Sequence, residues 1–197
     1  MQKLLSIVLV GLSINALAIG NSDNNGNLSN SLMDHSNMMY LDFGLGVGGA
    51  TSWNQTSLAI NAMDMGLYVN KNLGVEIGMD ALPNGANSAG QSMIMSYHMA
   101  AKGILPLSNM FSLYGKAGVG VNAFSGEQLG TNGMAMANEV SLGLYYAGGM
   151  QFNFNKNFAI YLEGSGIAGA PVGNNSNANT GGFGSTYMGT LGLEVRI

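Results

Sequence analysis

From residue 38 onward, apolar residues alternate with polar or very small residues along eight separate segments of the chain. In the segment LGVEIGMDA (73–81), every odd position is apolar and every even position is Gly, Glu or Asp. A period of two is that of a β-strand, whose successive side chains point to opposite faces. The segments predicted to be strands are 38–49, 57–70, 73–81, 91–105, 110–124, 138–154, 157–166 and 183–197. Each reaches the roughly 9–11 residues that a tilted strand needs to cross a bilayer.

The connections between these segments alternate between short and long. The short ones are 71–72, 106–109 and 155–156, and the long, Gly-, Asn- and Ser-rich ones are 50–56, 82–90, 125–137 and 167–182. Bacterial outer-membrane barrels place short turns on their periplasmic rim and longer loops on the outside. An even number of strands also returns both chain ends to the short-turn rim. The connections therefore favour an up-and-down barrel over a soluble sandwich.

The two faces of the predicted strands differ in charge. One face carries most of the large apolar residues and no charged residue, whereas the other carries many glycines, His98 and the strand charges Asp42, Asp64, Glu76, Asp80, Lys102, Lys116, Glu163, Glu194 and Arg196. A Lys or Arg facing lipid at mid-depth costs about 2–4 kcal/mol, so the uncharged face is expected to contact lipid. The interior of an eight-stranded barrel is just wide enough for side chains to fill. We therefore predict an all-β, eight-stranded antiparallel up-and-down transmembrane β-barrel with a side-chain-filled lumen, short periplasmic turns and longer extracellular loops.

Composition agrees with this fold and excludes several others. Only 8% of the 197 residues are charged, about a third of the share in soluble domains. The hydrophobic content of 47% is ordinary, and 31 residues are Gly. A net charge of −4 argues against a nucleic-acid partner. Because the chain has no Cys, it forms neither disulfides nor thiolate metal sites.

The first residues, MQKLLSIVLVGLSINALAIG, predict a secretory signal peptide. Lys3 precedes a largely apolar stretch over 4–17, and Ala16-Leu17-Ala18 fits the small-x-small cleavage rule. The alternative is an N-terminal membrane anchor, although this stretch is short for a span. We predict a signal peptide over 1–18, a polar disordered lead-in over 19–37 and the barrel over 38–197.

Three segments carry a resemblance to a known family. They are MAAKGILPLSNMFSLYGKAGVGV (99–121), GGMQFNFNKNFAIYLEG (148–164) and GTLGLEVRI (189–197). The chain resembles the OmpA-like family of eight-stranded outer-membrane β-barrel domains over residues 38–197. The resemblance implies the outer membrane of a Gram-negative bacterium, with its lipid and lipopolysaccharide as surroundings and the barrel-assembly machinery as a partner during insertion. No periplasmic peptidoglycan-binding domain follows the barrel segments, so a wall-tethering role is not expected.

Barrel geometry and the resemblance together suggest a structural ion-pair network in the lumen. A buried ion without a partner costs several kcal/mol, so the inward charges are expected to pair. The expected members are Asp42, Asp64, Glu76, Lys102, Lys116, Glu163, Glu194 and Arg196. Such a network would plug the lumen, and the alternative is a gated conduction path.

Two chemical alternatives remain less favoured. Ser96 and His98 share one predicted face and could form a nucleophile–base pair of the kind found in lipid A-modifying barrels. The deacylases of that kind have the His before the Ser, and parity points this pair into the lumen, so we expect no catalytic residues. The string MDHSNMM offers Met33, His35, Met38 and Met39 as soft ligands for Cu(I). It is a single copy of a Met/His motif that periplasmic copper-resistance proteins repeat, and we expect no cofactor and no metal centre.

The predicted function is therefore that of a structural outer-membrane barrel. Its surface loops, with Trp53, Glu127 and Met134 as their more distinctive residues, are available for adhesion or contact with an unknown partner. The rival prediction is a narrow channel for small solutes or ions. Three outward phenylalanines beside the short turns, Phe111, Phe152 and Phe158, are candidates for an aromatic girdle.

Overall fold

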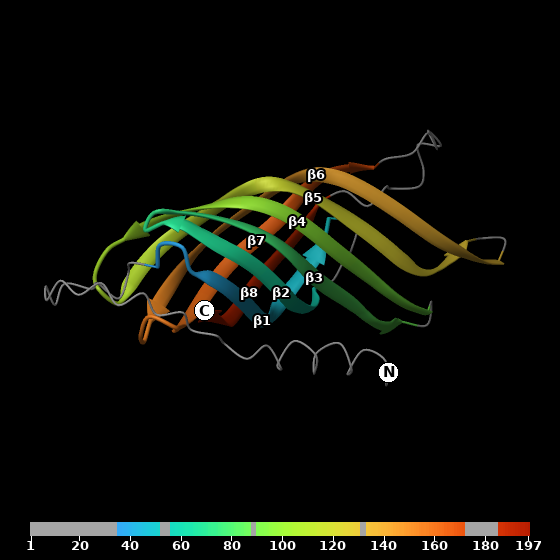
Figure 1. The fold of residues 1–197 in the computed structure, drawn as a ribbon. Helices are drawn as coiled ribbons and strands as arrows, with labels where there is room; N and C mark the ends of the chain where they lie inside the picture. Colours follow the sequence, from blue (N-terminus) through green and yellow to red (C-terminus); the bar gives the residue numbers. More distant parts are fainter. Residues whose placement is uncertain (1–34, 52–55, 88–89, 131–132, 172–184) are drawn as a thin grey trace, which may run out of the picture.

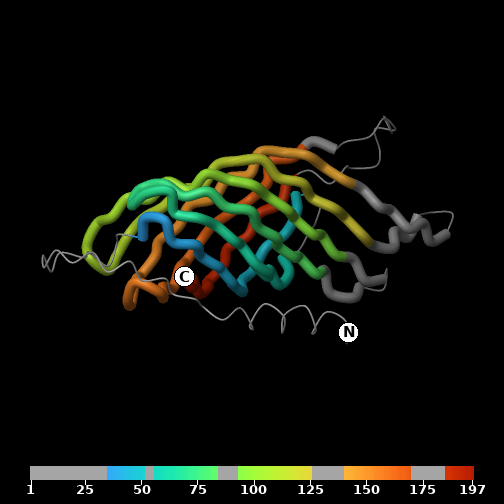
Figure 2. Tube along the Cα trace, in the orientation of Figure 1, coloured from blue at the N-terminus to red at the C-terminus, as the bar shows by residue number. Residues whose placement is uncertain are grey.

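Eight antiparallel strands close into a barrel in the computed structural model, which describes residues 35–51, 56–87, 90–130, 133–171 and 185–197 (Figures 1 and 2). The strands are β1 (Met39–Ala50), β2 (Ser57–Asn70), β3 (Leu73–Asn87), β4 (Gly90–Pro106), β5 (Phe111–Gly130), β6 (Gly133–Asn153), β7 (Phe158–Pro171) and β8 (Thr186–Arg196). Each strand pairs with its neighbours in the sequence, and β8 closes the ring by pairing with β1. The described part of the chain contains no helix that is long and apolar enough to cross a membrane. The predicted fold class is confirmed.

The short turns gather at one end of the barrel, on the left in Figure 1, and we call it the short-turn end. Asparagines shape two of these turns, because Asn70 Oδ1 accepts the backbone N–H of Asn72 at 2.9 Å and Asn155 Oδ1 accepts that of Phe158 at 2.9 Å. Both chain ends of the barrel lie at this end as well. Met39 and Ile197 exchange backbone hydrogen bonds of 3.0 and 2.9 Å there.

At the opposite end, which we call the hairpin end, several strands are longer than predicted. β3 continues to Asn87, and β5 and β6 stay paired out to Gly130 and Gly133. The segments 82–90 and 125–137, which were predicted to be loops, are therefore largely paired strand. The sequence hides this because a hairpin outside a bilayer meets water on both faces, so its strands need no apolar alternation. Backbone hydrogen bonding alone continues the ladder.

The outer face of the barrel is apolar around its whole circumference. Every strand exposes large aliphatic or Met side chains to the surroundings, among them Leu45, Leu67, Ile77, Met99, Val119, Leu144, Leu162 and Leu191. Leu144 is 68% exposed, the highest value among the exposed large hydrophobic residues. Soluble monomers rarely expose a continuous apolar patch above a few hundred Å². The belt therefore faces acyl chains.

A β-bulge in β2 changes the alternation of inward and outward side chains along this strand. Asp64 lies opposite Asp42, but Asn61 lies opposite Gly44, so Ala62 is an extra residue in β2. The same extra residue interrupts the pairing of β2 with β3 between Asn61 and Met63. Because of the bulge, Asn61 and Asp64 both point inward although their numbers differ in parity.

Inside the barrel, bulky rings lie directly opposite glycines on the neighbouring strand. The cross-strand pairs are Tyr40–Gly66, Tyr68–Gly74, His98–Gly78, Tyr114–Gly149, Tyr145–Gly118 and Tyr161–Gly192. A Cβ built on Gly66 would collide with the ring of Tyr40, and one on Gly192 with the ring of Tyr161. Many of the lumen glycines thus leave the space into which a neighbouring ring packs, as a narrow barrel requires.

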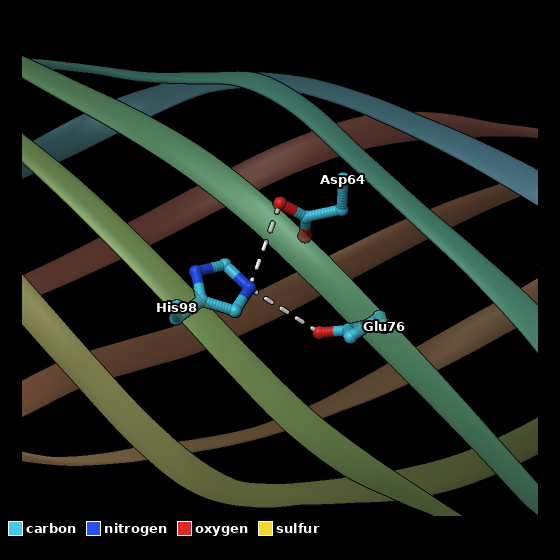
Figure 3. A group of neighbouring side chains, drawn as sticks. All are labelled: Asp64, Glu76 and His98. Atoms are coloured by element: carbon cyan, nitrogen blue, oxygen red, sulfur yellow. Dashed lines mark ion pairs between the residues drawn. The ribbon is translucent and has the colours of Figure 1, made fainter.

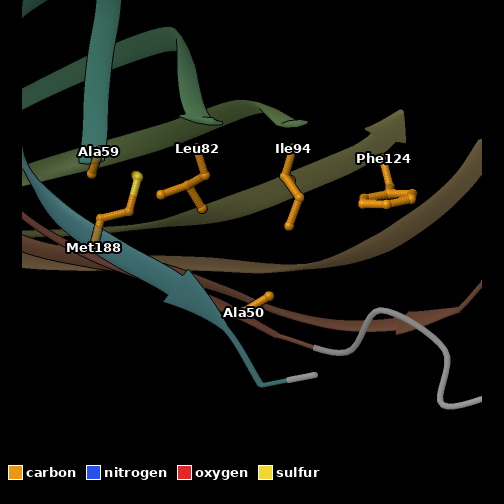
Figure 4. Packing of buried hydrophobic residues seen from close by; sticks show 6 residues of the cluster. All are labelled: Ala50, Ala59, Leu82, Ile94, Phe124 and Met188. Atoms are coloured by element: carbon orange, nitrogen blue, oxygen red, sulfur yellow. The ribbon is translucent and has the colours of Figure 1, made fainter. Parts of the chain in front are cut away.

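The lumen is apolar toward the hairpin end. Six buried side chains meet there and form what we call the apolar plug: Ala50, Ala59, Leu82, Ile94, Phe124 and Met188 (Figure 4). They come from β1, β2, β3, β4, β5 and β8. The polar part of the lumen lies between this plug and the short-turn end.

Candidate functional site

The polar lumen brings together all the inward charges that the sequence indicates. Each of the eight predicted members is buried: Asp42, Asp64, Glu76, Lys102, Lys116, Glu163, Glu194 and Arg196. Asp80 and His98 are buried beside them. Their positions on seven strands follow from the two-residue period, which points every second side chain inward.

Glu194 is the centre of the group nearest the short-turn end. Its carboxylate lies 2.8 Å from Lys102 Nζ, accepts the hydroxyl of Tyr68 at 2.7 Å, and pairs with Arg196 Nε. Arg196 also donates from Nη2 to Asn153 Oδ1 at 2.6 Å. One carboxylate thus joins two cations from β4 and β8, which ties opposite parts of the barrel wall together.

Lys116 is the centre of the next group. Its Nζ lies 2.8 Å from Glu76 Oε1, 2.8 Å from Glu163 Oε2 and 3.4 Å from Asp64 Oδ2. Tyr40 donates its hydroxyl to Glu76 Oε2 at 2.6 Å, and Tyr114 donates to Glu163 Oε2 at 3.0 Å. An ammonium with three donors suits such a position among carboxylates.

Tyrosines are the lumen residues that the sequence analysis missed. Tyr40, Tyr68, Tyr114, Tyr145 and Tyr161 are all buried, and the first four donate hydroxyl hydrogen bonds to Glu76, Glu194 or Glu163. Lys102 Nζ also lies 4.4 Å from the ring centroid of Tyr40, within cation–π range. These tyrosines occupy inward positions of the same two-residue alternation that identified the inward charges. The alternation therefore predicts their orientation as well.

His98 faces three carboxylates rather than a hydroxyl. Its Nε2 lies 3.6 Å from Asp64 Oδ1 and 3.5 Å from Glu76 Oε1 (Figure 3). Its Nδ1 lies 3.6 Å from Asp80 Oδ2. Ser96 instead donates its hydroxyl to Asn122 Oδ1 at 2.6 Å. The structure therefore does not pair Ser96 with His98 as a nucleophile and its base.

The buried charges of the lumen do not balance. Among the described residues, the buried carboxylates are Asp42, Asp64, Glu76, Asp80, Glu163 and Glu194, whereas the buried Lys and Arg residues are Lys102, Lys116 and Arg196. Charges enclosed away from water need compensation. The excess carboxylates therefore need protons or further cations, such as a charged His98, to compensate them.

The described residues of the string MDHSNMM lie in different surroundings. His35 is buried with its ring centroid 5.5 Å from that of Tyr68, and Asn37, at φ 64°, donates its backbone N–H to Tyr68 O at 2.7 Å. Met39 instead lies on the outer face, 45% exposed. Two predicted features lie outside the described residues. One is Trp53, and the other is the segment 1–34, which contains Met33, the predicted signal peptide and most of the lead-in.

The structure also gives the positions of the predicted girdle phenylalanines and of two of the predicted loop residues. Phe152 and Phe158 are exposed on the outer face beside the short turns, and Phe111 is half-buried there. Glu127 and Met136 lie opposite each other in the β5–β6 hairpin, and Met134 lies opposite Leu129.

Comparison with solved structures shows the same barrel in outer-membrane proteins. Ail, the attachment invasion locus protein of Yersinia pestis, solved with the heparin analogue sucrose octasulfate, has 15% identity and a TM-score of 0.55, covering 82% of this chain and 99% of that one. Neisserial surface protein A has 13% identity and a TM-score of 0.62, covering 81% and 96%. OprG of Pseudomonas aeruginosa has 11% identity and a TM-score of 0.53, covering 82% and 96%. At these identities the likeness concerns the fold.

The sequence itself identifies the family. No curated protein sequence matches the chain. The OmpA-like transmembrane domain, however, matches residues 27–195, which include all eight strands except the last residue of β8. The chain belongs to the OmpA-like transmembrane domain family and is an outer-membrane β-barrel.

Proposed function

We propose that this protein is a structural, non-conducting barrel that presents its extracellular hairpins for contact with another surface. The filled lumen is the observation that supports the first part. Ionic groups occupy its periplasmic portion, and the apolar plug follows on the extracellular side. An apolar constriction opposes the passage of hydrated ions. The two barriers in series favour a scaffold over the rival function of a narrow channel.

Recordings in planar bilayers test the closed lumen. The protein refolded in detergent and inserted into the bilayer is expected to give no stable conductance above that of the lipid alone. Simultaneous replacement of Leu82 and Phe124 by Ala removes two large members of the apolar plug and leaves the ionic groups in place. Brief open events of this variant would show that the ionic groups alone do not keep the lumen closed. Stable, cation-selective conductance of the unaltered protein would establish the channel instead.

The β5–β6 hairpin supports the second part of the proposal. Its ladder runs without interruption from Phe111↔Phe152 to Gly130↔Gly133, so a continuous sheet extends from the membrane to the hairpin tip. Binding residues often lie on loops that a rigid scaffold positions. Among the structural neighbours, Ail is named for attachment and invasion, and Neisserial surface protein A is named a surface protein.

Shortening this hairpin tests the contact. Replacing residues 127–136 by Asn-Gly joins Gly126 to Ala137, which already lie opposite each other, through a two-residue turn. Bacteria that express this variant should lose most of the adherence that the unaltered protein confers on them. The control shortens β3–β4 in the same way between Asn84 and Ser92, which are also paired. Equal adherence of bacteria that express the β5–β6 variant and bacteria that express the unaltered protein would rule out this hairpin as the contact site.

A non-enzymatic role is part of the same proposal. The hydroxyl of Ser96 is donated to Asn122, and His98 is enclosed by carboxylates and the ring of Tyr145. The mass spectrum of lipid A should therefore be the same with and without expression of the protein.

A further inference from the structure

We propose that the lumen holds one divalent transition-metal ion, with Asp64, Glu76 and His98 as ligands. These residues come from the adjacent strands β2, β3 and β4, and their donor atoms lie within 4.8 Å of one another (Figure 3). This inference does not depend on the proposed function, because a closed scaffold and a channel could each contain such an ion.

The donor atoms already have a spacing suited to a metal. His98 Nε2 lies 3.6 Å from Asp64 Oδ1 and 3.5 Å from Glu76 Oε1. Bonds of 2.0–2.2 Å in a tetrahedral site place neighbouring ligand atoms about 3.4 Å apart. Two of the three ligand–ligand distances are therefore close to the required value before any ion binds.

Hydrogen bonds hold the second carboxylate oxygen of Asp64 and of Glu76 and leave Asp64 Oδ1 and His98 Nε2 without one. Asp64 Oδ2 accepts from Asn61 at 2.9 Å, and Glu76 Oε2 accepts from Tyr40 at 2.6 Å. Asp64 Oδ1 and both ring nitrogens of His98 are buried without a hydrogen bond, whereas Glu76 Oε1 is paired with Lys116 Nζ at 2.8 Å. Groups that orient ligands in this way are typical of the surroundings of metal sites.

His98 is fixed in the orientation that a ligand needs. Its ring stacks on Tyr145 with centroids 3.9 Å apart and planes inclined by 1°. Asp80 Oδ2 lies 3.6 Å from Nδ1. At this distance Asp80 makes no hydrogen bond to Nδ1, but its negative charge favours the proton on that nitrogen and leaves Nε2 for the metal.

The charge of the lumen gives a second, independent reason for a cation. The buried carboxylates outnumber the buried Lys and Arg side chains by six to three, so a divalent ion bound by two of these carboxylates would offset part of their negative charge. Lys116 Nζ, 2.8 Å from Glu76 Oε1, shares that oxygen, but it keeps Glu163 as a partner at 2.8 Å when a metal binds Glu76.

The ligand types indicate the class of metal. One imidazole with two carboxylates suits Zn²⁺, Co²⁺ or Mn²⁺, whereas Ca²⁺ and Mg²⁺ prefer oxygen ligands alone. This set is distinct from the Met33, His35, Met38 and Met39 set, whose soft ligands would select Cu(I).

The test uses the untagged mature protein, refolded in detergent with excess ZnCl₂ and then desalted. We expect about one Zn²⁺ per chain by elemental analysis, and less than about a tenth of that for His98→Gln and Glu76→Gln. His35→Gln is the matched control, because it removes the only other histidine, and it should retain the ion. A heat-modifiability gel shows which variants are folded.

A spectroscopic measurement on the unaltered protein does not depend on how the variants fold. Co²⁺ added in place of Zn²⁺ should give the intense visible bands of a low-coordinate site. Absence of these bands, loss of Zn²⁺ from the unaltered protein on desalting, or equal Zn²⁺ content in folded His98→Gln would each overturn the proposal.

Discussion

At the scale of single residues, Lys116 is expected to be important for the stability of the barrel. Its ammonium lies between Glu76, Glu163 and Asp64, and no other Lys or Arg of the described residues lies within ion-pair distance of these carboxylates. Lys116→Met leaves buried carboxylates without this partner, which costs about 3–5 kcal/mol. The urea midpoint of unfolding in detergent or lipid vesicles, followed by gel mobility without boiling, should therefore fall.

Lys71→Met is the control for this prediction. Lys71 is exposed in the β2–β3 turn, and substitutions at such positions change stability by less than about 0.5 kcal/mol. Equal urea midpoints for the two variants would mean that the ion pairs of Lys116 add nothing to the stability of the barrel.

The residue scale also shows where reading the sequence succeeds and where it stops. Alternation predicted that Lys102 and Glu194 both point inward, and the structure places them there. It could not predict that they meet at 2.8 Å, because they are 92 residues apart on β4 and β8. Which inward side chains meet across a lumen depends on strand stagger and tilt, and the period of two carries no information about either.

At the scale of one element, the β2 bulge makes a prediction about deletions. Removing Ala62 would turn Asn61 and Met63 into neighbours and join two stretches of ladder that already have matching pairs, Gly44↔Asn61 and Asp42↔Asp64. Every other side chain of β2 would keep its face. The variant should therefore fold and show the mobility shift of a folded barrel on unboiled gels.

Deleting Met65 is the matched comparison. This residue lies in a regular ladder, opposite Leu41 and Ile77. Its loss would rotate everything from Ser57 to Asp64 to the opposite face, because a one-residue slip inverts a strand. Asp64 would then point into lipid, so this variant should not fold, and folding of both deletions to the same extent would contradict the bulge assignment.

Strand ends illustrate the limit of prediction at this scale. The start of β2 at Ser57 and its end at Asn70 match the predicted segment, as does the start of β3 at Leu73. Inside the membrane, one face meets lipid and the other a polar lumen, so the sequence must alternate. Beyond the membrane β5 continues to Gly130 without this requirement, and its residues resemble those of a loop although they form a ladder.

At the scale of the whole molecule, the fold depends on inverted polarity, with charges inside and the apolar belt outside. Leu144→Arg tests it, because Leu144 is 68% exposed near the middle of the belt and pairs with Val119. In a bilayer the substitution should cost about 2–4 kcal/mol, since the guanidinium would sit among acyl chains. Leu107→Arg is the matched control, at a site 55% exposed in the turn after the end of β4. This turn is expected to lie at the membrane surface, where the cost falls to about 0–1 kcal/mol. Unfolding free energies of both variants in lipid vesicles measure the difference. Equal values would mean that this belt does not face lipid.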